Sequence, residues 1–205
     1  LVSNNSTLVG CRIPGNKLAK KLITLFDLPI AAPSANLSER TSVTNIMDID
    51  PILVKKIFVL KDKQSSHGLE STVVRIDTNN EIEILRYGSI TVEELNKYAK
   101  VKIKKKSSIS PGNLKKHYST LKPIRMNAKR ILKNEGLLNF GNNKLKSKII
   151  NLNLSNKKNL NEAAKNFYHY LHKLDQSRCK KIAVVEIPDK GLGKTINDRL
   201  RRAIK

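Results

Sequence analysis

The sequence predicts an α/β protein in two parts, and two observations carry this prediction. Short β-rich runs alternate with segments of helical apolar spacing in both halves of the chain. A stretch rich in Lys, Ser, Pro and Gly separates the halves, and such a composition buries too little apolar surface to fold alone. We therefore expect a domain at 1–101, a linker at 102–124 and a second domain at 125–205.

The first part opens with a short apolar run at 8–13, which we interpret as a strand. A helix is expected over 16–26 and is stopped by Pro29, because five apolar residues share one helical face: Leu18, Ala19, Leu22, Leu25 and Phe26. A second helix is expected over 45–55, capped by Thr44. A buried strand at 57–60 should follow it.

A hairpin and a capped helix complete the first part. The runs 71–76 and 81–85 are rich in β-branched and aliphatic residues, and the residues 77–80 between them, Asp-Thr-Asn-Asn, are typical of a turn. Thr91 and Glu94 form the pattern of a capping box, which opens a helix running to Ala99.

The second part shows a β-α-β-α order, with strands at 148–154 and 181–187 and helices at 160–174 and 194–203. The first of these helices carries one apolar stripe, which we interpret as core: Ala163, Ala164, Phe167, Leu171 and Leu174. The alternation predicts a small Rossmann-like domain.

Composition narrows the function classes only partly. The 40 Lys and Arg against 17 Asp and Glu give a formal charge of +23, which attracts polyanions. The lysines are spread over every segment, however, so we read the charge mainly as a solvated surface. Cys11 and Cys179 lack partners at disulfide or zinc spacing, and no apolar run approaches the roughly 20 residues of a membrane span. We expect a cytoplasmic protein with no membrane partner.

Five segments carry candidate chemistry, and they occur in a characteristic order. They are Val9-Gly10-Cys11-Arg12-Ile13-Pro14, the loop 31–38 with Arg40 to Thr44 behind it, Gly68-Leu69-Glu70-Ser71-Thr72-Val73-Val74, Leu85-Arg86-Tyr87-Gly88, and Ser110-Pro111-Gly112 with His117-Tyr118. Their order and spacing resemble the second half of a YrdC-type domain and the linker of two-domain threonylcarbamoyl-AMP synthases. The segments 191–193 and 196–203 are similar to the closing signature of the same enzymes.

The resemblance implies a fold and an activity. The fold would be a partial YrdC-like twisted open sheet with helices, followed by the Rossmann-like accessory domain. The activity would be that of an L-threonylcarbamoyladenylate synthase, a nucleotidyltransferase that joins L-threonine, bicarbonate and ATP for the t6A modification of tRNA. It needs no side-chain nucleophile, and Mg²⁺ would sit on the ATP phosphates.

The resemblance also assigns the L-threonine site to Arg12, Ala32 and Ser71. A planar guanidinium at position 12 can grip a carboxylate through two hydrogen bonds, and by resemblance it holds the threonine carboxylate. Ala32 would contribute its backbone, and Ser71 would bond the threonine by analogy.

The ATP site would comprise Leu8, Ser34, Asn36, Ser42, Arg86 and Tyr118. Arg86 would face the triphosphate, where the leaving pyrophosphate needs a positive partner. Tyr118 lies in a region that would fold over the nucleotide as a lid. Asn36 and Ser42 would serve equally well as turn and cap residues, so both interpretations stay open. We expect the guanidinium groups of Arg12 and Arg86 to point into one shared cleft.

The chain departs from the family pattern in two ways. Glu39, Val43 and Tyr87 stand where Gly, Pro and Pro are usual, and Ser119-Thr120 replaces an Ala-Pro pair, changes that loosen loops. The upstream Lys-x-Arg segment and an early Thr, which face the substrates in the family, do not occur, and the sequence starts at Leu1. We expect an amino-terminally truncated form that is inactive or nearly so alone, unless a second chain supplies the missing part.

Three alternatives remain. A P-loop nucleotide binder is indicated by Gly191-Leu192-Gly193-Lys194-Thr195, but Pro188 replaces its first glycine and has no N–H for a phosphate. A non-catalytic module that binds double-stranded RNA fits the charge, although Phe, Trp and Tyr make up only 4% of the chain. A degenerate fragment without activity is the third. Possible macromolecular partners are tRNA and the machinery that transfers the threonylcarbamoyl group.

Overall fold

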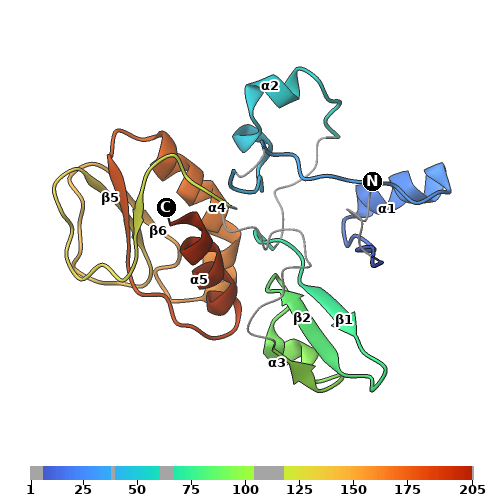
Figure 1. The fold of residues 1–205 in the computed structure, drawn as a ribbon. Coiled ribbons are helices and arrows are strands. Elements are labelled where there is room, and N and C mark those ends of the chain that lie inside the picture. The colour runs from blue at the N-terminus through green and yellow to red at the C-terminus, as the bar shows by residue number, and fades with distance from the viewer. Residues whose placement is uncertain (1–6, 38–39, 61–66, 104–117, 205) are drawn as a thin grey trace.

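The computed structural model describes residues 7–37, 40–60, 67–103 and 118–204. Their strands form two sheets, one of three strands in the first part and one of four in the second (Figure 1). Helices flank both sheets, so the predicted α/β class is confirmed. No described helix has the length and apolar character needed to cross a membrane.

The second part is a parallel sheet covered by two helices. The strands β4 (Ile124–Arg125), β7 (Lys181–Val184), β5 (Glu135–Asn139) and β6 (Asn151–Asn153) lie side by side in that order, and every neighbouring pair is parallel. Parallel strands need long crossovers, and helix α4 (Leu160–Gln176) forms the crossover from the edge strand β6 to β7, on the far side of β5. Helix α5 (Leu192–Ala203) packs against α4. The expected small α/β unit is therefore present.

Two strands of this sheet, β4 and β5, were not predicted. All five residues of β5 are buried, which is typical of a central parallel strand with helices or loops on both faces. Such a strand shows no alternation of polar and apolar residues, so its sequence, Glu-Gly-Leu-Leu-Asn, carries no period-2 signal.

The core of the second part forms where α4 lies on the sheet. The predicted stripe of α4 is confirmed, because each of its five residues is at most 1% exposed, and Tyr168 joins them. Ile182 and Val184 of β7 and Leu200 of α5 meet this stripe in one continuous cluster. Each large apolar side chain buried in this way contributes about 1.5–3 kcal/mol.

The first part contains the predicted hairpin. The strands β1 (Val73–Ile76) and β2 (Ile82–Arg86) are antiparallel, and the Asp77 carboxylate accepts hydrogen bonds from the backbone N–H groups of Asn79 and Glu81 in the turn. Strand β3 (Val101–Lys102) then adds in parallel to β2. Helix α3 (Val92–Leu95) starts with the predicted capping box but ends earlier than expected.

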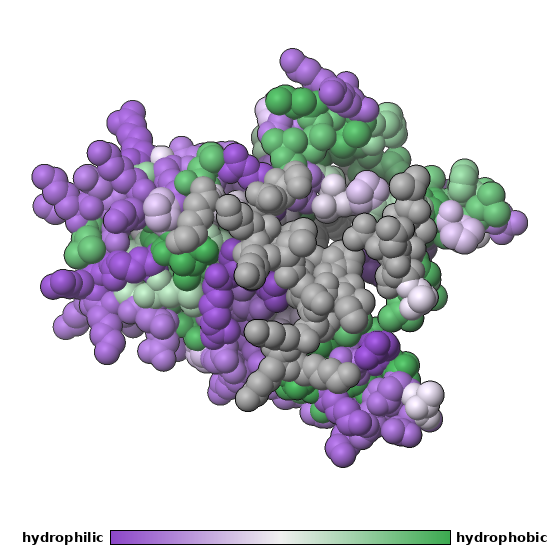
Figure 2. Space-filling model, viewed as in Figure 1, coloured by the Kyte–Doolittle hydropathy of each residue, from purple (hydrophilic) through white to green (hydrophobic). Residues whose placement is uncertain are grey.

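Helix α1 (Lys17–Phe26) has the predicted amphipathic face, and no element among the described residues buries it. Asn16 caps it by accepting a hydrogen bond from the Ala19 N–H, and Asp27 ends it in the left-handed region. None of its residues is buried, and Leu25 is 75% exposed. Figure 2 shows apolar side chains of this first part gathered around α1 and the α2 region, while the second part presents a mostly hydrophilic surface.

Three expectations for the first part were wrong. Residues 8–13 and 57–60 form no strand, because no described strand lies beside them to share backbone hydrogen bonds. The expected helix at 45–55 is two short helices, η1 (Ile46–Asp48) and α2 (Pro51–Val54). Asp50 accepts from the Ile52 N–H and Pro51 opens a new helix, so the chain restarts there.

Part of the predicted linker is firmly packed. Residues 104–117 lie outside the described residues, but Tyr118 and Thr120 are each 1% exposed. The Asp175 carboxylate at the end of α4 accepts hydrogen bonds from the N–H groups of Leu121 and Lys122. The Lys122 ammonium in turn donates to the Ser177 carbonyl at 2.8 Å. These contacts attach the end of the linker segment to the carboxyl end of α4.

Candidate functional site

Loops of the first part meet helices α4 and α5 in a partly buried polar cluster. We call it the Glu70–Arg199 cluster, and it consists of Ser42, Glu70, Ser71, Arg86, Tyr118, Tyr168 and Arg199. Glu70 and Ser71 precede β1 and Arg86 ends β2, while Tyr168 and Arg199 lie on α4 and α5.

The centre of the cluster is an ion pair between the fully buried Arg199 and Glu70, whose side chain is 16% exposed. The Nε of Arg199 donates to Glu70 Oε2 at 2.9 Å, and Arg199 is fully buried. Glu70 Oε1 accepts from the Tyr168 hydroxyl at 2.6 Å and from the Ser42 hydroxyl. Burial would raise the pKa of Glu70, but the charge of Arg199 and the hydroxyl donors outweigh it and hold that pKa below its usual value. Glu70 is therefore a carboxylate at neutral pH.

The guanidinium of Arg199 uses its other donors as well. One terminal nitrogen donates to Asp198 at 2.5 Å, and the other donates to the Tyr87 carbonyl at 2.6 Å. Burial alone would lower the pKa of Arg199, but Glu70 raises it above the usual value. Arg199 thus stays charged and links α5 to two segments of the first part, at Glu70 and at Tyr87.

Tyr118 covers one face of this guanidinium. Its ring centroid lies 4.6 Å from Arg199 Cζ and 6.2 Å from the Tyr168 ring. This is a cation–π contact in a buried environment, where such contacts are strongest. Burial, followed by the negative charge of Glu70, raises the pKa of Tyr118, so its hydroxyl stays protonated.

Arg86, at the end of β2, contacts the segment just before β1 at the edge of the cluster. Its Nη2 donates to the Ser71 carbonyl at 2.9 Å and lies 3.4 Å from the Ser71 hydroxyl. Gly88, two residues on, packs so closely that a Cβ there would lie 2.2 Å from the Thr72 nitrogen. The segments 70–72 and 86–88 are therefore held in direct contact.

The structure brings together four of the residues that the sequence singled out. Ser42, Ser71, Arg86 and Tyr118 belong to the cluster, whereas Leu8, Arg12, Ala32 and Ser34 are exposed on the segment 7–37. Asn36 is half-buried, and its amide donates to the carbonyls of Leu37 and Arg40, as a turn residue does. The shared cleft for Arg12 and Arg86 stays a prediction, since neither cavity described below is lined by them.

Sequence reasoning missed Arg199, Tyr168 and Thr195 as members of this region. Glu70 and Arg199 both lie in segments that carry the resemblance, but they are separated by 129 residues. Nothing in the local pattern pairs them. The available signal was that Arg199 lies at helical spacing with Ile196 and Ala203, on the apolar face of a charged helix, where a charge needs a buried partner.

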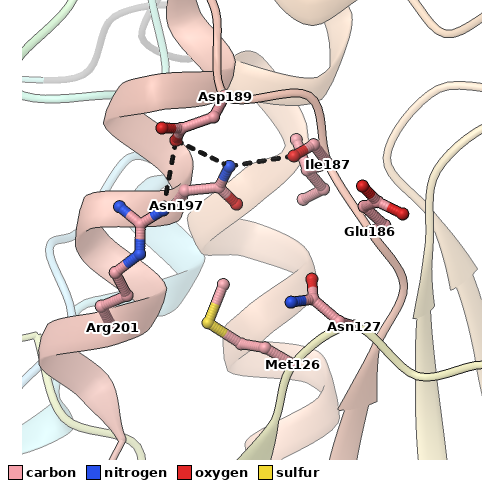
Figure 3. Close-up of a pocket in the computed structure, with 7 residues that line it drawn as sticks. All are labelled: Met126, Asn127, Glu186, Ile187, Asp189, Asn197 and Arg201. Atoms are coloured by element: carbon pink, nitrogen blue, oxygen red, sulfur yellow. Dashed lines mark hydrogen bonds and ion pairs between the residues drawn. The ribbon is translucent and has the colours of Figure 1, made fainter.

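The structure has two cavities of interest, one between the two parts and one within the second part. One of about 310 Å³ is bordered by the segments 36–51, 119–121 and 172–176. The other, of about 230 Å³, lies beyond the carboxyl ends of β4 and β7 (Figure 3). In it Asn197 donates to the Ile187 carbonyl and to Asp189, and Arg201 also contacts Asp189.

The geometry of 191–195 disfavours a phosphate cradle. The Gly191 N–H donates to the Glu93 carboxylate at 3.3 Å, so an acidic side chain already lies at the start of α5. The Thr195 hydroxyl is buried and donates to the Gly88 carbonyl at 2.9 Å. Lys194 lies over the Tyr87 ring, 5.1 Å from its centroid. The P-loop alternative thus loses the groups it would need.

Two family models match the chain in succession. The model described as Threonylcarbamoyl-AMP synthase, C-terminal domain, matches residues 90–204, and the Sua5/YciO/YrdC model, described as Telomere recombination, matches residues 1–88.

Curated relatives carry the same description. The threonylcarbamoyl-AMP synthase of Pyrococcus abyssi (strain GE5 / Orsay) is 26% identical over 99% of this chain and 66% of its own length. The enzyme of that name from Schizosaccharomyces pombe is 34% identical over 58% of this chain and 32% of its own length. The one from Bacillus subtilis is 28% identical over 95% and 62%. The chain thus spans less than two thirds of the length of these relatives.

Solved structures agree with the observed fold. A crystal structure of P. abyssi Sua5 complexed with L-threonine matches with a TM-score of 0.81 at 25% identity, covering 95% of this chain and 63% of that one. A doubly substituted P. abyssi Sua5 matches with a TM-score of 0.72 at 23% identity, covering 95% and 62%, and supports the fold alone.

Proposed function

Because the chain belongs to the threonylcarbamoyl-AMP synthase family, we propose that it serves the synthesis of L-threonylcarbamoyl-AMP from L-threonine, bicarbonate and ATP. The observation that carries the proposal is the succession of both family models along the chain. The Glu70–Arg199 cluster supports it, because it gathers four candidate substrate-binding residues from both matched regions.

The proposed reaction proceeds in two steps. The amine of L-threonine attacks the carbon of bicarbonate and loses water, giving a carbamate. A carbamate oxygen then attacks the α-phosphorus of ATP, and pyrophosphate leaves with the electron pair of the broken P–O bond. Neither step needs a covalent bond to the protein, so catalysis rests on positioning and on stabilisation of charge.

We assign to Arg86 the stabilisation of the negative charge that develops on the leaving pyrophosphate. Its guanidinium is held in place by the Ser71 carbonyl, and a fixed cation costs no reorganisation when charge develops. Leu8, Ser34, Asn36 and Tyr118 would complete the ATP site. Ser42 donates its hydroxyl to Glu70, so a phosphate contact by Ser42 would require this bond to be exchanged.

L-threonine would be held by Arg12, Ala32 and Ser71. The P. abyssi protein complexed with L-threonine supports an L-threonine site in the family. Ser71 lies beside Arg86, so the threonine and ATP would meet at this serine.

Mg²⁺ would come with ATP rather than from a protein site. The described residues contain no group of three or more His, Cys, Asp and Glu that could hold a metal. Glu70, the carboxylate of the cluster, is engaged by Arg199, Tyr168 and Ser42. The chemistry of this cluster does not fit a resident metal.

The proposed product would be consumed in tRNA modification, so tRNA or the threonylcarbamoyl-transfer machinery is the proposed macromolecular partner. We also propose a cytoplasmic location, which the two unpaired thiols of Cys11 and Cys179 support.

Isothermal titration tests the substrate assignment. We expect saturable binding of L-threonine and of ATP to the chain, and loss of L-threonine binding in Arg12→Ala. Lys20→Ala, which removes another exposed cation nearby in sequence, is the matched control and should bind normally. Binding of L-threonine by Arg12→Ala at wild-type strength would remove Arg12 from the site.

A pyrophosphate-release assay tests the reaction. Release from ATP that requires both L-threonine and bicarbonate would support the proposal. Binding of neither substrate by the wild-type chain, or ATP hydrolysis independent of L-threonine, would overturn it.

A further inference from the structure

Three contacts join α5 to the segment that carries Arg86. Lys194 lies over the Tyr87 ring, the Thr195 hydroxyl donates to the Gly88 carbonyl, and Arg199 donates to the Tyr87 carbonyl. Each contact falls within two residues of Arg86. The face of α5 that carries these residues therefore sets where the end of β2 lies.

Arg199 also contacts two other segments of the candidate site. Its Nε donates to Glu70, the residue before Ser71, and its guanidinium lies against the Tyr118 ring. One side chain of the second part thus contacts the segments at 70–71, 86–87 and 118. Each of these segments carries a residue assigned to L-threonine or ATP.

Arg199 cannot itself touch a substrate, because it is fully buried. The neighbours of Arg199 also match the planar shape of its guanidinium. Glu70 accepts from Nε, and Asp198 and the Tyr87 carbonyl accept from the two terminal nitrogens. The Tyr118 ring lies on the face of the group. A lysine would keep the charge, but its ammonium lacks this planar set of donors.

We propose that Arg199 is a positioning residue that sets the mutual placement of Ser71, Arg86 and Tyr118, with Thr195 fixing the adjoining Gly88. The second part is then a requirement for substrate binding as well as a folded support. This inference rests on the proposed function, because it concerns the same site.

The geometry gives a graded set of variants. Arg199→Lys keeps the buried charge opposite Glu70 and loses the planar contacts. Thr195→Val keeps the shape and loses one hydrogen bond, and Thr195→Ser restores the hydroxyl. Arg201→Gln is the matched control, since Arg201 lies on the same helix, has a side chain that is 57% exposed, and pairs with the exposed Asp189.

The test is titration of the full chain with ATP and with L-threonine, at a temperature where circular dichroism shows each variant folded. Loss of one neutral hydrogen bond corresponds to about a 2- to 10-fold change in an equilibrium constant. Thr195→Val should therefore lower the affinity for ATP by that factor, and Thr195→Ser should restore it. Arg199→Lys should weaken ATP binding more than Thr195→Val. Arg201→Gln should bind as the wild type does.

The outcomes separate the two proposals. Wild-type affinity in folded Arg199→Lys and Thr195→Val overturns the positioning role and leaves the proposed function intact. A wild-type chain that binds neither substrate overturns both. If Arg199→Lys does not fold, the Thr195 pair alone decides, because a purely structural role predicts equal affinities for Thr195→Val and Thr195→Ser.

Discussion

Glu70 keeps its charge in a largely buried place because both of its carboxylate oxygens accept hydrogen bonds. Arg199 donates to one oxygen and supplies the positive charge, and the hydroxyls of Tyr168 and Ser42 donate to the other. Removing one member of such a pair costs more than the pair contributes, since the other charge stays buried without compensation.

The first prediction concerns Glu70→Gln. It should lower the free energy of unfolding by about 3–5 kcal/mol at pH 7, because Arg199 loses its buried partner. Since the pKa of Glu70 is lower in the folded protein than its ordinary value of 4.5, its contribution is present above pH 4.5 and is lost as the pH falls through the folded pKa. The difference between wild type and variant should therefore shrink in acid.

Urea denaturation between pH 7 and pH 3 measures this effect. The control is Glu186→Gln, which removes an exposed carboxylate of the second part. A Glu70→Gln deficit that stays constant down to pH 3 would contradict the assignment.

A second prediction concerns Gly68, where the first part touches the backbone of α4. Gly68 has a φ of +65°, and a Cβ there would lie 2.3 Å from the Ala164 carbonyl oxygen. Gly68→Ala should destabilise the protein by about 1–3 kcal/mol through overpacking, with the left-handed backbone adding to the cost. Gly10→Ala, where a Cβ meets nothing within 4 Å, should change the denaturation midpoint little. Equal midpoints for both variants would count against this contact.

At the scale of elements, helix ends are set by single side chains. The Asn159 amide oxygen accepts hydrogen bonds from the N–H groups of Asn161 and Glu162 at the start of α4. Asn159→Ala should therefore cost about 1 kcal/mol of stability. Asn161→Ala, an exposed substitution two residues later, should be nearly neutral. Thermal denaturation compares them, and a larger loss in Asn161→Ala would refute the cap.

At the scale of the whole molecule, stability is concentrated in the second part. The main apolar cluster takes all its buried members from residues 118–203, apart from Leu69. Helix α1 buries none of its residues. Segments with few buried contacts open at low free energy, so the two parts should differ in hydrogen exchange.

We expect backbone amides of β7 and α4 to exchange slowest and those of α1 to exchange orders of magnitude faster under native conditions. Hydrogen–deuterium exchange read by mass spectrometry compares peptides covering 17–26 and 181–187. α5, a helix of similar length to α1, is the internal control and should be protected. Protection of α1 equal to that of α5 would contradict this picture.

Local sequence signals were sufficient for elements that are stabilised by their own residues. The Asn16-capped helix, the Asp77 turn, the Thr91 capping box and the apolar stripe of α4 all follow from spacing over a few residues. The motif residues Ser42, Ser71, Arg86 and Tyr118 were likewise identified by local pattern, and the structure groups them.

Only the tertiary structure decided which distant residues meet. Strand β5 is recognisable by its neighbours β6 and β7, and the runs at 8–13 and 57–60 fail as strands because a strand needs a partner outside its own sequence. The sequence by itself determined the local helices, the hairpin and the family motifs. The pairing of Glu70 with Arg199 across 129 residues required the folded chain, because a buried charge selects its partner by proximity in space.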